Sequence, residues 1–201
     1  MSAVDETIIR LFFELHGFFV RKPGPRPGGS RKRADDGEFT LLVQNPSAVQ
    51  VSGKPGFLVF ASELRYLGEA EVTVKRWPET RFSAGMLQSG LRLFRFLEKT
   101  ALPRTREESA AGDGTGGSDD AGLTKRILVV PGLPTTEPYR SKTETLFRHK
   151  GISGLISFRA MLLEVINRLD ANSATGGSET LETLRLLKKY NLAGSAQMEL
   201  F

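Results

Sequence analysis

One short stretch of this chain limits its possible folds more than any other, the run Glu-Ala-Glu-Val-Thr-Val-Lys-Arg-Trp at positions 69–77. Small or apolar residues alternate with polar ones from Glu69 to Lys75, which is the period-two pattern of a β-strand with one buried face and one polar face. Side chains two positions apart on a strand point to the same side of a sheet. The pattern therefore predicts a strand that directs Glu71, Thr73 and Lys75 toward one place.

Two elements with related features precede this strand. Residues 5–16 have apolar side chains at helical spacing, with Asp5 as the expected N-cap and Gly17 as the stop, and a short strand is expected over residues 18–21. A second strand is expected over residues 38–43, in the sequence Glu-Phe-Thr-Leu-Leu-Val, before Asn-Pro ends it. Thr40 lies in the middle of this strand. The chain thus presents a helix with Glu6, a strand with Thr40 and a strand with Thr73 and Lys75, in that order.

This order resembles the PD-(D/E)XK nuclease superfamily, in which a strand with a lone Asp precedes a strand with the pattern acid-x-Lys. The resemblance covers roughly the first half of the chain and implies a restriction-endonuclease-like α/β fold, a mixed sheet flanked by helices, within a domain over residues 1–170. It implies that Lys75 is the site lysine and that Glu6 is the helix glutamate that often points at the site. The two acid positions of the family are occupied here by Thr40 and Thr73.

The loss of both acids bears on metal chemistry. Nucleases of this kind hold Mg²⁺ through carboxylates, because a hard cation prefers charged oxygen ligands, and the metal activates the attacking water. A threonine hydroxyl is neutral, so two negative charges are missing. We therefore expect a catalytically degenerate, nuclease-like DNA-binding protein without a metal cofactor, acting as an accessory in DNA repair or replication.

Relocated ligands offer an alternative in which the chain is an active, Mg²⁺-dependent nuclease. Glu38 shares a strand face with Thr40, and Glu71 shares one with Thr73, so these two glutamates and Glu6 are candidate metal ligands. The other interpretation, which we prefer, is that the three glutamates are ordinary solvated residues.

A basic loop follows the first short strand. Residues 21–33 combine prolines and glycines with six cations, Arg21, Lys22, Arg26, Arg31, Lys32 and Arg33. Prolines and glycines at this density exclude a helix or a central strand, so we expect an exposed loop. Its cations are candidates for binding DNA phosphates without reading bases, and the net charge of +5 suits such a partner without requiring it. A solvated loop that serves only solubility fits equally well.

The second half of the chain continues an α/β pattern. We expect a helix over 85–99 with Leu87, Leu91, Phe94 and Leu97 as its apolar stripe, and a disordered insertion over 104–123, which is rich in Gly, Ser and acidic residues. A buried strand is expected over 126–131, a helix opened by a capping box at Ser141 and Glu144, a short strand over 152–158 and a helix over 160–169. Such alternation supports one α/β domain.

The C-terminal part ends in a candidate partner-binding peptide. A linker over 171–178 is followed by a helix over 179–190 capped by Ser178 and by a flexible tail over 191–201 that ends Gln-Met-Glu-Leu-Phe. This ending resembles the bacterial sliding-clamp-binding peptide, Gln-Leu-(Ser/Asp)-Leu-Phe. The resemblance implies that Leu200 and Phe201 enter an apolar pocket, Met198 fills a shallower one and Gln197 bonds to backbone at the rim. In the alternative, Leu200 and Phe201 pack back onto the core.

Several kinds of chemistry have no support in the sequence. The chain has no Cys, which excludes disulfides and cysteine-based metal sites. It has no phosphate-binding Gly-Lys-Ser/Thr loop and no Gly-x-Ser-x-Gly elbow, and its two histidines, His16 and His149, are far apart in sequence. Neither a signal-peptide pattern nor an apolar run of membrane-spanning length is present, so we expect a cytoplasmic protein without a membrane partner. A protein-interaction module that never meets DNA remains a further alternative.

Overall fold

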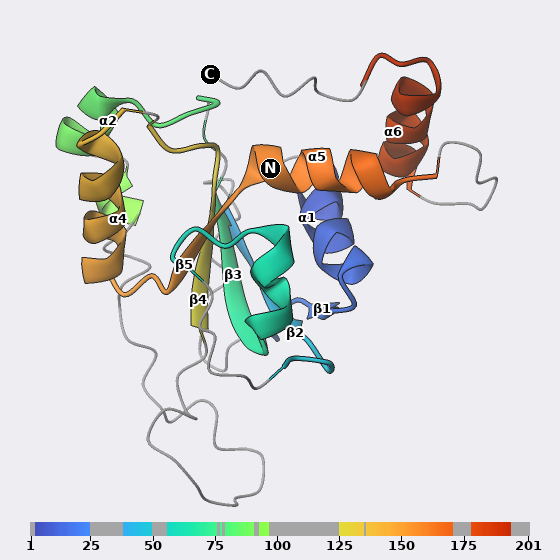
Figure 1. The fold of residues 1–201 in the computed structure, drawn as a ribbon, viewed down its shortest axis with the longest axis horizontal. Helices are drawn as coiled ribbons and strands as arrows, with labels where there is room; N and C mark the ends of the chain where they lie inside the picture. Colours follow the sequence, from blue (N-terminus) through green and yellow to red (C-terminus); the bar gives the residue numbers. More distant parts are fainter. Residues whose placement is uncertain are drawn as a thin grey trace, which may run out of the picture.

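The computed structural model describes residues 3–24, 38–49, 56–75, 77, 79–90, 93–96, 125–134, 136–170 and 178–193. Its centre is a five-stranded mixed sheet made of β1 (Phe19–Arg21), β2 (Glu38–Gln44), β3 (Glu69–Lys75), β4 (Lys125–Val130) and β5 (Gly154–Ser157). The helices are α1 (Ala3–Leu15), the 3-10 helix η1 (Ala61–Tyr66), α2 (Ala84–Ser89), α4 (Tyr139–His149), α5 (Phe158–Arg168) and α6 (Glu179–Lys189). Figure 1 shows α2 and α4 on one side of the sheet and α1, α5 and α6 on the other.

The strands lie in the sheet in the order in which they occur in the chain. β2 is antiparallel to both β1 and β3, whereas β3, β4 and β5 are parallel to one another. The amino end of β2 therefore lies beside the carboxyl ends of β3, β4 and β5. We call this side of the sheet, where these strand ends lie, the upper edge. The prediction of a mixed α/β fold is confirmed.

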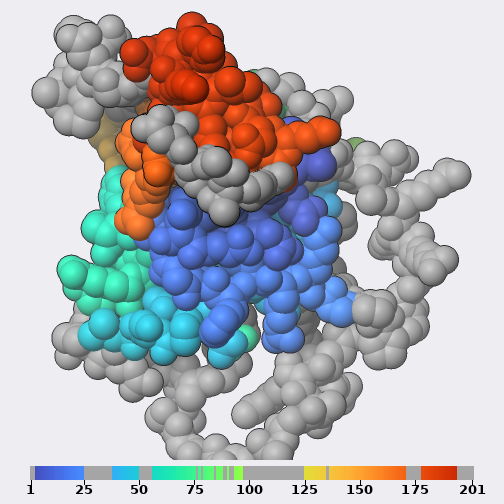
Figure 2. Space-filling model, turned by 90° about the vertical axis from the view of Figure 1, so that its right-hand side faces the viewer, coloured from blue at the N-terminus to red at the C-terminus, as the bar shows by residue number. Residues whose placement is uncertain are grey.

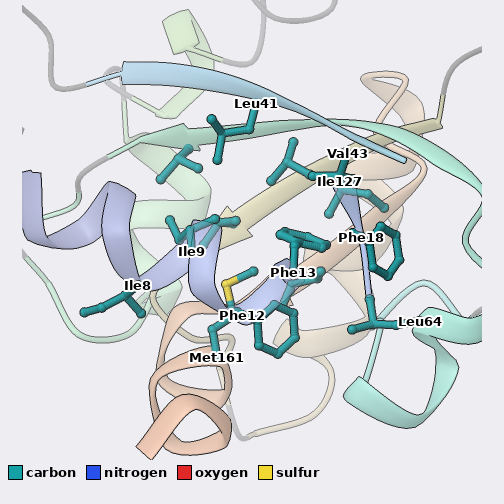
Figure 3. Close-up of a cluster of buried hydrophobic side chains, with 14 of the residues drawn as sticks. Ile8, Ile9, Phe12, Phe13, Phe18, Leu41, Val43, Leu64, Ile127 and Met161 are labelled. Carbon is teal, nitrogen blue, oxygen red and sulfur yellow. The ribbon is translucent and has the colours of Figure 1, made fainter. Parts of the chain in front are cut away.

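The larger core lies between the sheet and the helices α1 and α5. Ile9, Phe12 and Phe13 of α1 are fully buried or nearly so, because apolar residues at helical spacing form one face of the helix. They pack with Met161 of α5 and with strand residues such as Val72, as part of the cluster in Figure 3. Burying each such side chain contributes about 1.5–3 kcal/mol. The apolar half of the β3 pattern thus faces α1 and α5.

A second core covers the opposite face of the sheet on the side of β4 and β5. Phe82, Phe96 and Phe147 are almost completely buried there together with Leu128 and Leu155. The ring centroids of Phe82 and Phe147 are 6.2 Å apart in a stacked arrangement. This aromatic packing fixes the position of the chain that follows β3.

The C-terminal helix α6 packs on α1 and α5, and Figure 2 shows it in red above the blue helix α1. Leu184 places one side chain of α6 in the larger core. Ser178 caps the helix as expected, because its hydroxyl accepts a hydrogen bond from the Leu181 N–H at 3.4 Å. At the other end, the Lys188 ammonium donates to the carbonyls of Asn167 at 2.8 Å and Leu169 at 2.6 Å, where α5 ends. α6 is thus fastened to α5 by both apolar and charged contacts.

Some local predictions were wrong for identifiable reasons. The described part of α1 begins at Ala3, so Asp5 lies in its first turn rather than at the cap. α4 begins at Tyr139 after Pro138, and the Ser141 hydroxyl donates to Glu137 Oε2 at 2.7 Å instead of opening the helix. The expected helix over 85–99 is interrupted, because α2 ends at Ser89 and the chain turns at Gly90.

The interruption at Gly90 changes which side chains are buried. After this glycine the helical residues 93–96 bury Leu93 and Phe96, while Phe94 stays half-exposed. The buried positions after the break are therefore Leu93 and Phe96, and the predicted place of Phe94 in the apolar stripe is wrong. The predicted insertion over 104–123 and the expected linker, apart from Ser178, lie outside the described residues. None of the described helices has the length and the apolar character needed to cross a bilayer.

Candidate functional site

Thr40 of β2 and Thr73 of β3 lie directly opposite each other on adjacent antiparallel strands. Residues in such register have Cβ atoms about 4.5–5.5 Å apart and point to the same face. The side chain of Thr73 is almost completely buried, with 7% of the residue exposed. Two neighbouring strands therefore bring these threonines together, although neither threonine lines the cleft described below.

The predicted site lysine lies two residue pairs nearer the upper edge than the threonine pair. Lys75 is directly opposite Glu38, and both share the face of the two threonines, because they are two positions away along their strands. Glu71 is on the same face but opposite Leu42, on the far side of the threonine pair. Glu71 is four positions from Lys75, so Glu38 and Glu71 lie about 13 Å apart along the strands.

The third candidate ligand, Glu6, lies in the first turn of α1 and forms an ion pair with Lys22, with Oε1 and Nζ 2.8 Å apart. Within the described ranges, no group of three His, Cys, Asp or Glu side chains is arranged to hold a metal ion. A single Mg²⁺ requires oxygen ligands at about 2.0–2.1 Å, so Glu38 and Glu71 would have to reach toward each other across the threonine pair. A metal site made of Glu6, Glu38 and Glu71 stays a prediction.

The Lys75 ammonium lies against aromatic rings. Its Nζ is 5.3 Å from the centroid of the Trp77 ring and 4.8 Å from that of Phe96, which are cation–π distances. The Trp77 ring in turn makes edge-to-face contacts with Phe82 at 5.1 Å and with Phe96 at 5.7 Å between centroids. The second core thereby fixes both Trp77 and the lysine beside it.

Sequence reasoning treated Trp77 only as the end of the strand and missed its place in the site. A signal was present, because Trp77 follows Lys75 by two positions and a strand continued by two residues keeps the same face. The spacing alone therefore indicated that Trp77 lies on the same face as Lys75.

A cleft of about 610 Å³ opens at the upper edge, over the carboxyl ends of β3 and β4. It is bounded by the first turns of α1 and α5, by Trp77 and by residues 79–81. Its apolar walls are formed by Val74, Val129, Val130, Pro131, Phe158 and Leu162. Ligand sites of open α/β sheets commonly lie outside the carboxyl ends of their strands, and this volume is within the range of about 300–1,000 Å³ typical of small-molecule sites.

Charged side chains surround the opening of this cleft. Three are cations, Lys75, Arg81 and Arg159, and two are carboxylates, Asp5 and Glu79. Arg81 and Arg159 are exposed, whereas Lys75 is half-buried. The excess of one positive charge favours an anionic ligand, or the anionic part of a larger ligand.

Two described residues that flank the segment 25–37 lie close to this cleft. Lys22 contacts Glu6, the neighbour of the cleft residue Asp5, and Glu38 is opposite the cleft residue Lys75. The described residues on either side of the segment 25–37 therefore both lie at the upper edge. Four of the loop cations, Arg26, Arg31, Lys32 and Arg33, lie outside the described residues, as do the tail residues Gln197, Met198, Leu200 and Phe201.

Arg21 belongs to a different part of the surface. It lines a smaller hollow of about 290 Å³ beside β1 and β2, together with the carboxylates of Glu14 and Glu69. Two acids against one cation make this hollow a poorer phosphate site than the cleft. Of the six loop cations, Arg21 therefore lies away from the upper edge, whereas Lys22 lies at the upper edge beside Glu6.

No protein-family model, no curated protein and no solved structure matches this chain.

Proposed function

We propose that this chain is a DNA-binding accessory protein of DNA repair or replication, built on a restriction-endonuclease-like domain whose metal-binding acids have been replaced. One observation carries the proposal: Thr40 and Thr73 are directly opposite each other, and Lys75 follows on the same face. In the resemblance, these threonines correspond to the two acids. An Asp strand paired with an acid-x-Lys strand would put its acids in this same relation. The consecutive order of the strands, with β2 antiparallel to its neighbours, agrees with such a fold.

Loss of catalysis follows from the chemistry of the two threonines. A phosphodiester nuclease of this type needs a divalent cation to activate water and to neutralise charge that develops on the phosphate. Two neutral hydroxyls supply neither the charge nor the ligand strength for that cation. The aromatic contacts of Lys75 keep its ammonium in place without a metal-bound carboxylate beside it.

DNA as the partner is supported by the distribution of cations at the upper edge. The cleft has Lys75, Arg81 and Arg159 around its opening, and Lys22 and Glu38, which flank the segment with the other loop cations, lie beside it. Contacts between such cations and phosphates release counterions, so binding would be strong at low salt, weak at high salt and tolerant of sequence.

Recruitment to a sliding clamp is the second part of the proposal and is supported by the sequence of the tail. Gln197, Met198, Leu200 and Phe201 have the residue types and spacing of a clamp-binding peptide at the end of the chain. α6 packs into the domain, and the last described residue, Ala193, is only four residues from Gln197. A short peptide in this place would tether the domain to DNA that carries a clamp.

The test is a binding titration of fluorescently labelled DNA, read by anisotropy at several salt concentrations. The variant Lys32→Ser/Arg33→Ser should bind more weakly, and the slope of log K against log salt should fall by about 2 if both cations contact phosphates. The matched control is Lys142→Ser/Lys189→Ser, which removes the same charge from exposed positions on α4 and α6 and should leave the slope unchanged.

Two results would replace this proposal by its alternatives. Mg²⁺-dependent cleavage of plasmid or branched DNA that is abolished by Glu71→Gln would establish an active nuclease with relocated ligands. No anisotropy change at low salt with any DNA would favour a protein-interaction module.

A further inference from the structure

The cleft at the upper edge combines an apolar interior with a charged opening, and neither part alone identifies its ligand. Its interior is formed by aliphatic residues, by Phe158 and by one side of Trp77. An interior of this kind excludes a bare phosphate from its depth, because an ion buried against apolar walls loses its hydration without compensation. The interior therefore suits a flat, largely apolar group, and the opening suits an anion attached to it.

Trp77 is held in a defined orientation by its neighbours. Its edge-to-face contacts with Phe82 and Phe96, and the Lys75 ammonium beside it, leave little freedom for the indole to rotate. A rigid aromatic side chain contributes more to binding, because less side-chain entropy is lost when the ligand arrives. Nucleobases pack on aromatic side chains with little regard to sequence, since every base has a π face.

The backbone beside each of the two exposed arginines at the opening is also fixed. The segment with Arg81 is fixed where the Phe82 N–H donates to the Gly132 carbonyl at 3.0 Å. Arg159 lies in the first turn of α5, which follows β5 directly, and the Ser157 hydroxyl donates to the Pro131 carbonyl at 3.3 Å at this junction. Guanidinium groups bind phosphate through two parallel hydrogen bonds, so both positions suit a sugar-phosphate chain that enters the cleft.

We infer that this cleft binds an unpaired nucleotide of DNA, with its base in the apolar interior beside Trp77 and its phosphates on Arg81 and Arg159. The inference rests on the proposed DNA-binding function and specifies the form of DNA recognised. A base that is paired and stacked inside a duplex cannot enter a cleft, whereas a base in a single strand, gap or flap can. The carboxylates of Asp5 and Glu79 disfavour additional phosphates and so limit the cleft to one nucleotide step.

The chain contains a single tryptophan, so the fluorescence of the whole protein reports on this cleft. The experiment titrates the full chain with oligo-dT, with a blunt duplex of equal length and with thymidine 5′-monophosphate, and follows both tryptophan emission and, for the two DNAs, anisotropy of labelled DNA. A parallel titration of N-acetyl-tryptophanamide corrects for absorption by the nucleic acid. Oligo-dT should quench Trp77 with saturation, and the blunt duplex should bind without changing the emission.

The variant Arg81→Ser/Arg159→Ser tests the phosphate contacts at exposed positions, so it should fold like the wild type. Its affinity for oligo-dT should fall at least tenfold, and by a clearly larger factor than its affinity for the blunt duplex. The charge-matched control, Lys142→Ser/Lys189→Ser, should leave oligo-dT binding unchanged.

Each outcome separates the inference from the proposed function. Binding of both DNAs with constant Trp77 emission, or with no effect of the arginine pair, would overturn the inference and leave DNA binding intact. Equal quenching by oligo-dT and blunt duplex would also overturn it. Saturable quenching by the mononucleotide without any DNA binding would uphold the cleft as a nucleotide site and overturn the proposed function instead.

Discussion

Under the proposed kinship with the nuclease fold, acids introduced at Thr40 and Thr73 should convert the threonine pair into a metal site. In the variant Thr40→Asp/Thr73→Glu, two carboxylates would replace hydroxyls on directly opposite residues of β2 and β3. Opposite Cβ atoms lie about 5 Å apart. Two unit charges at about 5 Å repel by about 3 kcal/mol at an effective dielectric constant near 20. Because Thr73 is only 7% exposed, solvent screens little of this repulsion.

The variant should therefore be destabilised in the absence of metal and stabilised in its presence. A loss of about 3 kcal/mol in the free energy of unfolding lowers the Tm of a chain of this size by roughly 6–12 °C. A divalent cation at 100 times its Kd would return about 2.7 kcal/mol, since it binds only the folded state. Thermal unfolding with Mn²⁺, Mg²⁺ or a monovalent salt of equal ionic strength measures both effects.

The neutral variant Thr40→Asn/Thr73→Gln is the matched control, because it has nearly the same side-chain volume without the charges. It should show the packing cost of the larger side chains and no specific response to Mn²⁺. If the acidic variant responds to Mn²⁺ no more than this control does, the two threonines do not occupy the positions of metal-binding acids. That result would remove the main support for kinship with the nuclease fold.

Three further predictions concern the fold and the tail. Gly90→Ala should destabilise the protein by more than 1 kcal/mol in chemical denaturation, since an added Cβ would meet the Met86 backbone oxygen; Gly85→Ala, with nothing within 4 Å, should be neutral or slightly stabilising. Lys188→Met should cost about 1–2 kcal/mol by losing its hydrogen bonds to the end of α5, whereas Lys189→Met on the exposed side should change little. Removing residues 197–201 should abolish capture by immobilised sliding clamp and leave Tm and DNA affinity unchanged; retention on the clamp would refute the tail peptide as the anchor.

Much of the fold followed from local patterns. The alternation from Glu69 to Lys75 identified β3, and its apolar half is indeed buried against α1 and α5. The first helix and the C-terminal helix followed from apolar spacing, and Ser178 was recognised as a cap. Such signals are readable because they depend on residues close together in the chain.

Other features were not indicated by apolar periodicity or by the expected capping patterns. Gly90 interrupts what looked like one helix, so that Leu93 and Phe96 rather than Phe94 face the second core. Pro138 and Glu137 decide how α4 starts, which made Ser141 a side-chain partner instead of a cap. In both cases the helix boundary lies at a glycine or a proline, which apolar periodicity alone does not take into account.

The sequence by itself determined that Thr73 and Lys75 share a strand face, because backbone geometry alternates side chains in every strand. Only the tertiary structure decided that Thr40 is the residue opposite Thr73, since register depends on how the whole sheet packs. It alone also assembled the cleft, whose charged residues come from two helices, the end of a strand and the segment before α2: Asp5, Lys75, Glu79, Arg81 and Arg159. Residues so far apart in the chain meet because the parallel strands β3, β4 and β5 end at one edge of the sheet, where α1 and α5 also begin.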